Sequence, residues 1–271
     1  KYKNYTMLEL LLYRLSLSKN IDDIVVVIPN GKNDIPLKNY IQKLGYKFFL
    51  GSETNVLKRY YSASKKHKAD VIVRITADCP LLDPLLLDEM LEEYTNSKLD
   101  YLSNTIKPTY PDGMDIEIFS MKTLSIANKK AKTLYEREHV TPFIKNNHKF
   151  KKENFFLNKD LSDLRITLDT RDDLENIKSI LNYFYPNKDF TMNDIKRLPN
   201  AIKRKIMTER IEGSEMNTGE KMWARALSVI PDGNMFFSKR PNLFLKRKWP
   251  IYFSKAKGCY IWDLDNKKYI D

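Results

Sequence analysis

Two aspartates stand directly after apolar, β-branched runs of this sequence, and their side chains could do chemistry together. Asp78 follows the run VIVRITA, and Asp169 follows LRITL. Apolar runs without polar alternation, separated by helical patterns, are typical of buried strands in a parallel sheet. Ligands of open α/β sheets bind beyond the carboxyl ends of such strands. Because Mg²⁺ takes one or two carboxylates plus water and phosphate oxygens, the pair predicts a magnesium site for phosphate chemistry.

The same two aspartates also stand where helix caps are common. Asp-Cys-Pro and Asp-Thr-Arg each precede a helical pattern, and an aspartate at such a position accepts hydrogen bonds from the first free N–H groups of the helix. Spacing alone does not separate this capping interpretation from the metal-binding one.

The elements that position these residues alternate along the chain. Helical spacing is present over residues 5–18, 34–45, 54–67, 84–97, 120–131, 134–147 and 171–185, and short strand-like runs cover 22–30, 46–50, 70–76, 100–105, 114–120, 149–157 and 164–170. We expect Ser52 or Thr54 to open the third helix, Pro84 to lie in the first turn of the fourth, and Pro142 to kink a helix or begin a new one. The alternation predicts an α/β fold with a parallel sheet covered by helices on both faces.

Composition limits the class of protein. The chain has 271 residues, 42% of them hydrophobic, which can bury one large core or one and a half ordinary domains. It contains no apolar run near the ~18 residues of a membrane span, and its start is charged and amphipathic, so we expect a cytoplasmic protein. Cys79 and Cys259 lack a CxxC or histidine context, and neither a disulfide framework nor a zinc site is expected.

The net charge of +12 raises the question of a nucleic-acid partner. Its lysines are scattered rather than clustered, and the Tyr and Phe residues fall mostly at core spacing, whereas an RNA-binding surface would interleave exposed aromatics with basic residues. A solvated basic surface that helps to attract an anionic substrate is the better interpretation.

Seven segments occur in an order that points to a known family: MLELLLYRL, GSETNVLKRYY, ADVIVRITADCPLLDP, DYLSNT, TYPDGMDIEIFS, EREHVTPFI and LRITLDTRDDLENI. Over residues 1–198 the chain resembles the cytidylyltransferases of the spore-coat polysaccharide biosynthesis type, which are related to the CMP-sugar-acid synthetases. The resemblance implies a Rossmann-like nucleotide-diphospho-sugar transferase sheet. It also implies Mg-dependent transfer of CMP from CTP to an anionic acceptor, namely a sugar acid, a sugar or polyol phosphate, or a phosphonate. Pyrophosphate would be released, in surface-polysaccharide or modified-sugar biosynthesis.

The resemblance assigns the nucleotide side of the site. Asp78 and Asp169 match the aspartates that carry the magnesium of bound CTP, and they would be catalytic. Gly51 and Ser52, between a strand and a helix, would meet the nucleotide through free N–H groups and a hydroxyl, although an ordinary helix cap explains them as well. Arg74 is expected on the same strand and side as Asp78, and its partner is either the nucleotide or a neighbouring acid.

The resemblance also assigns an acceptor side. Asp112, Gly113, Asp115 and Glu117 of the loop PTYPDGMDIEIF are candidates for acceptor binding, with Gly113 allowing a tight turn and Asp115 and Glu117 on one face of a strand.

Further along the chain, the stretch EREH places Arg137, Glu138 and His139 in a single turn. Arg137 is a catalytic candidate that could bind an acceptor carboxylate or phosphate, with Glu138 and His139 as further substrate contacts. The alternative for this stretch is an exposed charged turn.

Family members begin with a strand and a glycine-rich loop of the kind GSTRLPGK, which holds the triphosphate. By the resemblance this chain starts just after that loop, so we expect it to bind CTP poorly and to be inactive or poorly soluble alone. The strand would lie between the runs at 22–30 and 70–76.

The last third of the chain differs in character. Residues 199–219 are polar and charged and indicate a helix end and a linker. Residues 220–271 resemble the opening of class III pyridoxal-phosphate aminotransferases of the glutamate-1-semialdehyde aminomutase type. The carrying features are a helix around WARALSVIPDG and the hairpin GCYIWDLDNKKYID, in which Asn266 takes a position that needs positive φ. The implied whole is a fusion in which only the complete protein would bind pyridoxal phosphate.

Three interpretations therefore compete: a nucleotidyltransferase, an aminotransferase with an accessory front domain, and a non-enzymatic basic binding module. Members of both families commonly dimerise, so a homodimer is a candidate assembly.

Overall fold

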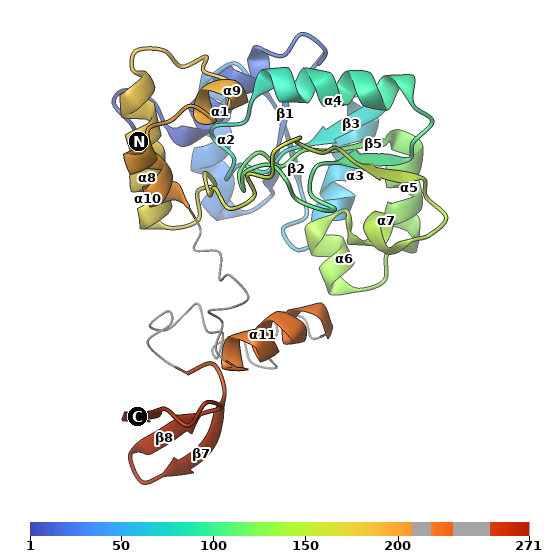
Figure 1. Ribbon diagram of the computed structural model, residues 1–271. Coiled ribbons are helices and arrows are strands. Elements are labelled where there is room, and N and C mark those ends of the chain that lie inside the picture. Colours follow the sequence, from blue (N-terminus) through green and yellow to red (C-terminus); the bar gives the residue numbers. More distant parts are fainter. Residues whose placement is uncertain (208–217, 230–249, 271) are drawn as a thin grey trace. The chain divides into compact units, whose positions relative to one another are not determined.

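The computed structural model describes residues 1–207, 218–229 and 250–270. It divides into two compact units, residues 1–208 and residues 209–271 (Figure 1). Residues 200–206 form a helix, α10 (Asn200–Ile206), which packs on α8 and buries Ile206 to 1% exposure. The first compact unit therefore extends beyond residue 198, where the sequence suggested a linker, and most of the rest of that predicted linker lies outside the described residues.

Helices and strands alternate through the first 100 residues as the periodicity predicts. The elements are α1 (Met7–Ser16), β1 (Val25–Pro29), the 3₁₀ turn η1 (Lys32–Asp34), α2 (Ile35–Lys43), β2 (Lys47–Gly51), α3 (Val56–Lys66), β3 (Val71–Arg74) and α4 (Pro84–Asn96). Pro84 occupies the first turn of α4, where its missing N–H costs no hydrogen bond.

The second half of this unit carries shorter elements. They are β4 (Tyr101–Ser103), β5 (Glu117–Ser120), α5 (Met121–Lys130), α6 (Leu134–His139), α7 (Pro142–Asn146), β6 (Lys152–Asn154), α8 (Arg171–Phe184), α9 (Met192–Ile195) and α10. Pro142 begins a new helix rather than kinking a long one, and Val140 just before it has a φ of 71°. The helix predicted over 134–147 is therefore two short helices.

The strands form two sheets in this unit. Strands β1 and β2 pair in parallel, and a second sheet has the order β3-β5-β4-β6. In the second sheet β5 runs antiparallel to both β3 and β4, whereas β4 and β6 are parallel. The sheet is thus mixed, and the predicted parallel arrangement does not extend to β5, because the chain turns back in the loop before it and returns beside β4 without a crossover helix.

One predicted strand is absent. Residues 164–170 form no strand; Arg165 makes an isolated bridge to Asp112, and Leu164 makes one to Met207. The apolar run is nevertheless buried at Leu164 and Ile166. Burial explains the pattern of apolar residues, and the pattern by itself did not establish strand pairing.

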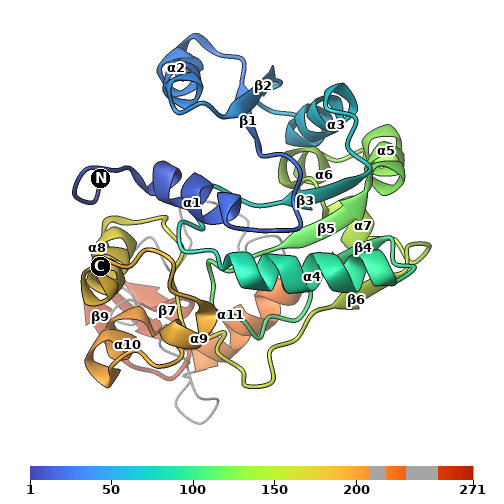
Figure 2. The same ribbon diagram turned by 90° about the horizontal axis from the view of Figure 1, so that it is seen from above.

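Helices cover both faces of the β3-β5-β4-β6 sheet, as the sequence predicts (Figures 1 and 2). Ile118 of β5 faces a core shared with α1, α4 and α8, and the next residue, Phe119, faces a core shared with α3, α5 and α7. A third cluster joins α1, β1 and α2 through Leu12, Ile28 and Ile41. Alternate side chains of a strand point to opposite faces, so both faces of β5 are buried.

Two cavities lie between the sheets. One of 350 Å³ is lined by α1, β1, α3 and residues 73–77, and one of 410 Å³ is lined by β1, α3 and β3. Among the described strands β1 pairs with β2 and β3 with β5, so these cavities separate the two strands. The expectation that a further strand belongs between them stays a prediction.

The turn at Gly113 fixes how the loop before β5 meets the segment before α8. Gly113 has a φ of 104°, and a Cβ built there would lie 2.6 Å from the backbone nitrogen of Thr167 and 2.7 Å from the carbonyl carbon of Ile166. Only glycine fits this approach without moving one of two backbones.

We expect Gly113→Ala to lower the free energy of unfolding by about 3 kcal/mol, because it adds a backbone clash to the cost of positive φ. Gly45→Ala is the matched control, since Gly45 has a φ of 80° but nothing within 4 Å of a Cβ. That variant should lose only about 1 kcal/mol. Equal losses in urea unfolding of the two variants would show that close packing at Gly113 contributes nothing.

The second unit contains a helix and a small sheet. Helix α11 (Thr218–Val229) covers part of the predicted WARALSVIPDG helix; residues 230–233 lie outside the described residues. Strands β7 (Phe253–Lys257), β8 (Tyr260–Asp263) and β9 (Lys268–Ile270) form an antiparallel meander. The predicted hairpin is confirmed, and Asn266 has the expected positive φ, 64°.

The state of the two cysteines and the character of the helices are described next. Cys79 and Cys259 are both free thiols, Cys79 buried and Cys259 exposed. None of the described helices combines the length and the apolar character that crossing a bilayer requires.

Candidate functional site

Neither Asp78 nor Asp169 caps a helix. Asp83 caps α4 by accepting a hydrogen bond from the Leu85 N–H at 2.9 Å. Thr170 caps α8, and its hydroxyl accepts from the Asp173 N–H at 3.1 Å. Because other residues perform the capping that could have explained the two aspartates, their carboxylates are left available for another role.

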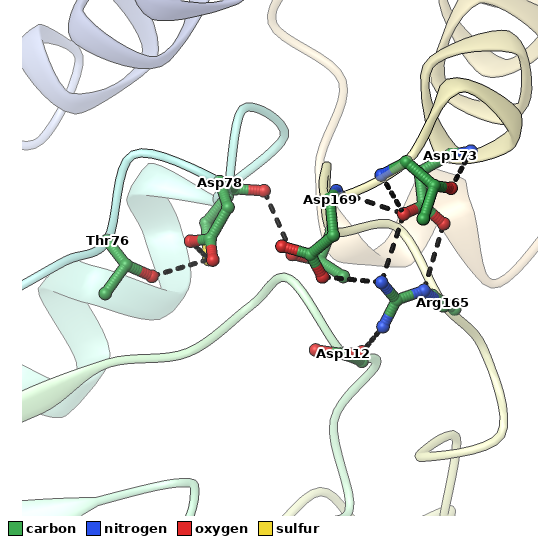
Figure 3. A network of polar contacts seen from close by, with 9 residues as sticks. Thr76, Asp78, Asp112, Arg165, Asp169 and Asp173 are labelled. Carbon is green, nitrogen blue, oxygen red and sulfur yellow. Dashed lines mark hydrogen bonds and ion pairs between the residues drawn. The ribbon is translucent and has the colours of Figure 1, made fainter. Parts of the chain in front are cut away.

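The segments that carry the two aspartates lie side by side. The carbonyl oxygen of Asp78 accepts hydrogen bonds from the Leu168 N–H at 2.8 Å and from the Thr167 hydroxyl at 3.1 Å. In Figure 3 the Asp169 carboxylate lies on the side of Asp78, while the Asp78 carboxylate lies toward Thr76 and Cys79. The described contacts thus join the two segments through the Asp78 carbonyl, while the Asp78 carboxylate accepts from the Cys79 thiol at 3.5 Å.

A cation that the sequence analysis missed organises this edge. Arg165 donates to Asp169 at 2.6 Å, to Asp112 at 2.5 Å and to both carboxylate oxygens of Asp173, at 2.9 and 3.0 Å (Figure 3). These hydrogen bonds raise the pKa of Arg165, with Asp173 as the largest contributor. The signal was present: an arginine amid the apolar run LRITL needs an acidic partner, the argument already applied to Arg74.

Negative charge exceeds positive charge here. Burial raises the pKa of Asp112, and the Asp169 and Asp78 carboxylates raise it further, against the pull of Arg165. Burial also raises the pKa of Asp115 to about 6, with contributions from Asp112, Glu117 and Asp78. An excess of close carboxylates favours binding of a cation.

The described residues hold no group of three or more His, Cys, Asp or Glu side chains arranged for a metal ion. A cation site here would therefore be of the kind in which two carboxylates hold the ion and the ligand's oxygens and water complete its shell. Asp169 already uses Oδ2 for Arg165, which leaves Oδ1 for a cation.

We expect Asp115→Asn to stabilise the metal-free protein at neutral pH. The folded pKa of about 6 lies above the ordinary 3.8, so the folded state binds the proton more tightly, and ionisation costs stability as pH rises through this window. The gain from Asp115→Asn should be absent below pH 4 and reach about 3 kcal/mol above pH 6. Urea unfolding between pH 4 and 8 measures it, with the exposed Glu92→Gln as control. A gain that does not grow with pH would contradict this assignment.

A second polar cluster is centred on Glu117, which is 3% exposed. Its carboxylate pairs with Arg74 and with Lys145 at 2.8 Å, and accepts hydrogen bonds from the hydroxyls of Tyr101 at 2.6 Å and Thr141 at 2.7 Å. Burial alone would raise the pKa of Glu117, but Lys145, Arg74 and the hydrogen bonds outweigh it and lower this pKa to about 2. Glu117 is therefore a buried permanent anion.

This cluster answers the open question about Arg74. Its described charged partner is the neighbouring acid Glu117. The expectation that Arg74 and Asp78 share one strand and one side is wrong, because β3 ends at Arg74 and Asp78 lies in the turn that follows.

Gly51 and Ser52 lie at the end of β2, before α3. Asn55, not Ser52 or Thr54, caps α3, accepting from the Lys58 N–H at 2.9 Å. The Ser52 hydroxyl accepts from the Asn55 N–H at 3.0 Å, and a Cβ at Gly51 would lie 2.8 Å from the Arg59 side chain. Both residues serve local structure here, and their contact with a nucleotide stays a prediction.

The residues predicted from the EREH stretch differ in their contacts. Arg137, Glu138 and His139 are all exposed on α6. Arg137 donates to the carbonyl of Ala131 at 3.3 Å, whereas His139 lines a small cavity together with Arg74. His139 is thus the residue of the stretch that the structure brings to the Glu117 cluster.

A mixed sheet covered by helices on both faces, with carboxylates gathered beyond its strands, places the chain among the open α/β proteins, which bind ligands outside the strand ends. A family model described as Cytidylyltransferase matches residues 1–191, and the chain belongs to this family.

Individual relatives agree with this membership. The uncharacterized protein MJ1063 of Methanocaldococcus jannaschii is 34% identical over 215 residues, covering 77% of this chain and 84% of that protein. The spore coat polysaccharide biosynthesis protein SpsF of Bacillus subtilis is 30% identical over 182 residues, 64% of this chain and 75% of SpsF.

Solved structures give the same result for the fold. A cytidylyltransferase from Leptospira borgpetersenii superposes with a TM-score of 0.73 at 32% identity, covering 78% of this chain and 90% of that one. CMP:2-keto-3-deoxy-manno-octonic acid synthetase complexed with CTP gives a TM-score of 0.50 at 12% identity, covering 68% and 90%. The second likeness concerns the fold alone.

Proposed function

We propose that this chain, as part of its parent protein, transfers CMP from CTP to an anionic acceptor and releases pyrophosphate. Family membership supports nucleotidyl transfer from CTP, and likeness to SpsF, a spore coat polysaccharide biosynthesis protein, supports a surface-polysaccharide or modified-sugar product. The acceptor classes are a sugar acid, a sugar or polyol phosphate, and a phosphonate, which all present an anionic oxygen.

One observation gives the proposal its strongest support. Asp78 and Asp169 lie on hydrogen-bonded neighbouring segments, yet neither caps a helix. Neighbouring carboxylates that do not cap helices, one of them with an oxygen that Arg165 leaves free, are candidates for chemistry.

The residues present fit a magnesium ion. Asp78 and Asp169 would hold it, within an acidic edge where Asp112 and Asp115 add negative charge. When bound, magnesium neutralises phosphate charge as pyrophosphate departs. Arg165 fixes the Asp169 side chain and keeps one of its oxygens free.

In the reaction, an acceptor oxygen forms a bond to the α-phosphorus of CTP, and the bond to the bridging oxygen breaks with its electron pair leaving on pyrophosphate. Where the attacking oxygen is a hydroxyl, its proton needs an acceptor, and Asp115, whose pKa burial raises to about 6, is a candidate for that role. The chain otherwise positions the two substrates and needs no covalent nucleophile.

The proposal is tested by measuring pyrophosphate release by the parent protein with CTP and magnesium, against a panel of 2-keto sugar acids, sugar phosphates, polyol phosphates and phosphonates. We expect release with at least one acceptor, loss on chelation, and preference for CTP over ATP, GTP and UTP. Absence of release with every acceptor, from protein whose fold is intact, would overturn it.

We also propose, on independent grounds, that the second unit begins an aminotransferase domain. The supporting observation is the β7-β8-β9 meander with Asn266 at positive φ, in the form that the resemblance implies. Reading the parent gene downstream of codon 271 tests this. A lysine after a strand within a full-length aminotransferase domain is the expected result, and an unrelated or absent continuation would contradict it.

A further inference from the structure

A cavity of 290 Å³ lies where β3, α6 and α7 meet, apart from the acidic edge that holds Asp78 and Asp169. Its wall includes Arg74, His139, Lys145 and Asn146. All four of these side chains can donate hydrogen bonds, and two of them are permanently charged. Such a lining suits an anionic group.

The charged side chains that line the cavity are cations. Arg74 and Lys145 both line it, whereas Glu117, which pairs with both of them, does not. Asp115 also acts on Lys145 from the strand side, so the two cations are matched in number by two carboxylates, but the cavity wall itself contains no carboxylate. An anion in the cavity would therefore meet the two cations without a carboxylate in the same wall.

Donors are also available. The buried Nε of Arg74 has no hydrogen-bond partner among the described residues. Lys145 uses its ammonium for Glu117 and for the Thr105 hydroxyl, at 3.1 Å, which leaves one of its three hydrogens. The Nε of Arg74 is covered by protein atoms, so a donor hydrogen that remains available to a ligand in the cavity is the one left on Lys145.

The position suits a second substrate. Arg74 lines this cavity and also the 350 Å³ cavity, whose wall continues through Thr76 and Ala77 to the position before Asp78. A group bound in the smaller cavity would therefore contact an arginine that also lines the 350 Å³ cavity.

We propose that this cavity, here named the Arg74 pocket and lined by Arg74, His139, Lys145 and Asn146, binds the acidic group of the acceptor, a carboxylate or a phosphate. The proposal rests on the proposed function for the identity of the ligand as an acceptor. In this proposal Arg74 and Lys145 bind the acidic group of the acceptor, in place of Arg137. Arg137 is exposed and donates a hydrogen bond to the Ala131 carbonyl.

Charge reversal at the rim tests the pocket in the full chain. His139→Glu and Asn146→Asp change exposed residues, so both variants should fold. His148→Glu is the matched control, since His148 is an exposed histidine that does not line the pocket. Binding is followed by backbone amide shifts during titration with inorganic phosphate and, separately, acetate.

We expect saturable shifts around residues 74 and 139–146, about tenfold weaker binding in each rim variant, and unchanged binding in His148→Glu. The probe that saturates at the lower concentration identifies phosphate or carboxylate as the preferred acid. Shifts that map elsewhere, or that are equal in all three variants, would overturn the proposal.

A kinetic arm separates this proposal from the proposed function. With an acceptor that supports turnover, His139→Glu should raise the KM for the acceptor about tenfold and leave the KM for CTP within twofold. Turnover with an unchanged acceptor KM would overturn the proposal about the pocket and leave the proposed function intact. Phosphate bound in the pocket, without turnover of any acceptor, would support the pocket and overturn the proposed function.

Discussion

Asp78→Asn and Asp169→Asn should each reduce CMP transfer by about a thousandfold while the protein stays folded. The expected size is that of removing one group that stabilises developing charge in an active site, about 4 kcal/mol. Little stability should be lost, because Asp169 is 53% exposed in its ion pair with Arg165 and exposed pairs contribute about 1 kcal/mol or less.

Asp172→Asn provides the matched control for these variants. Asp172 is exposed in the first turn of α8, three residues beyond Asp169. It should retain activity within about twofold, because it faces neither Arg165 nor Asp78 in any described contact. Initial rates of pyrophosphate release and thermal unfolding of all three variants decide the matter. Near-normal rates in Asp78→Asn, with the fold intact, would show that this carboxylate has no part in the reaction.

Glu117→Gln should be among the most destabilising single changes in the first unit, at about 3 kcal/mol. The substitution keeps size and hydrogen-bonding capacity but leaves Arg74 and Lys145, with 18% and 33% side-chain exposure, without their anion. Removing one partner of a buried pair costs several kcal/mol because an uncompensated charge stays behind. Glu175→Gln is the control, since Glu175 pairs with Lys178 at 2.8 Å but is 68% exposed. It should lose less than 1 kcal/mol.

The effect of Glu117 depends on pH with a definite sign. Its folded pKa of about 2 lies below the ordinary 4.5, so the carboxylate stabilises the fold above pH 4.5, and that contribution falls as pH decreases toward 2. The stability gap between the native protein and Glu117→Gln should be constant from pH 5 to 8 and shrink below 4.5. A gap that instead widens on acidification would contradict the ionised state assigned to Glu117.

Local periodicity predicted what depends on local physics. Helices from α1 to α4 and strands β1 to β3 follow from apolar spacing and turn residues, since an amphipathic face or a buried strand must show it in sequence. The positions of Asp78 and Asp169 at segment ends were visible for the same reason.

Contacts between distant segments were not visible. The Glu117 cluster joins Arg74 of β3, Tyr101 of β4 and Lys145 of α7. The periodicity of a sequence does not show which of its segments will meet. The antiparallel course of β5 was missed because alternation marks a strand without giving its direction. Arg165 is different, because an arginine within an apolar run already demands a partner, and the rule that singled out Arg74 would have found it.

The central claim is that Asp78 and Asp169 share one divalent cation beside the phosphates of CTP. Manganese replaces magnesium in the parent protein with bound CTP, and anomalous diffraction locates the ion. We predict one manganese within about 2.2 Å of a carboxylate oxygen from each aspartate, with the Asp78 side chain turned toward Asp169. Manganese bound to the phosphates but to neither aspartate would contradict the account.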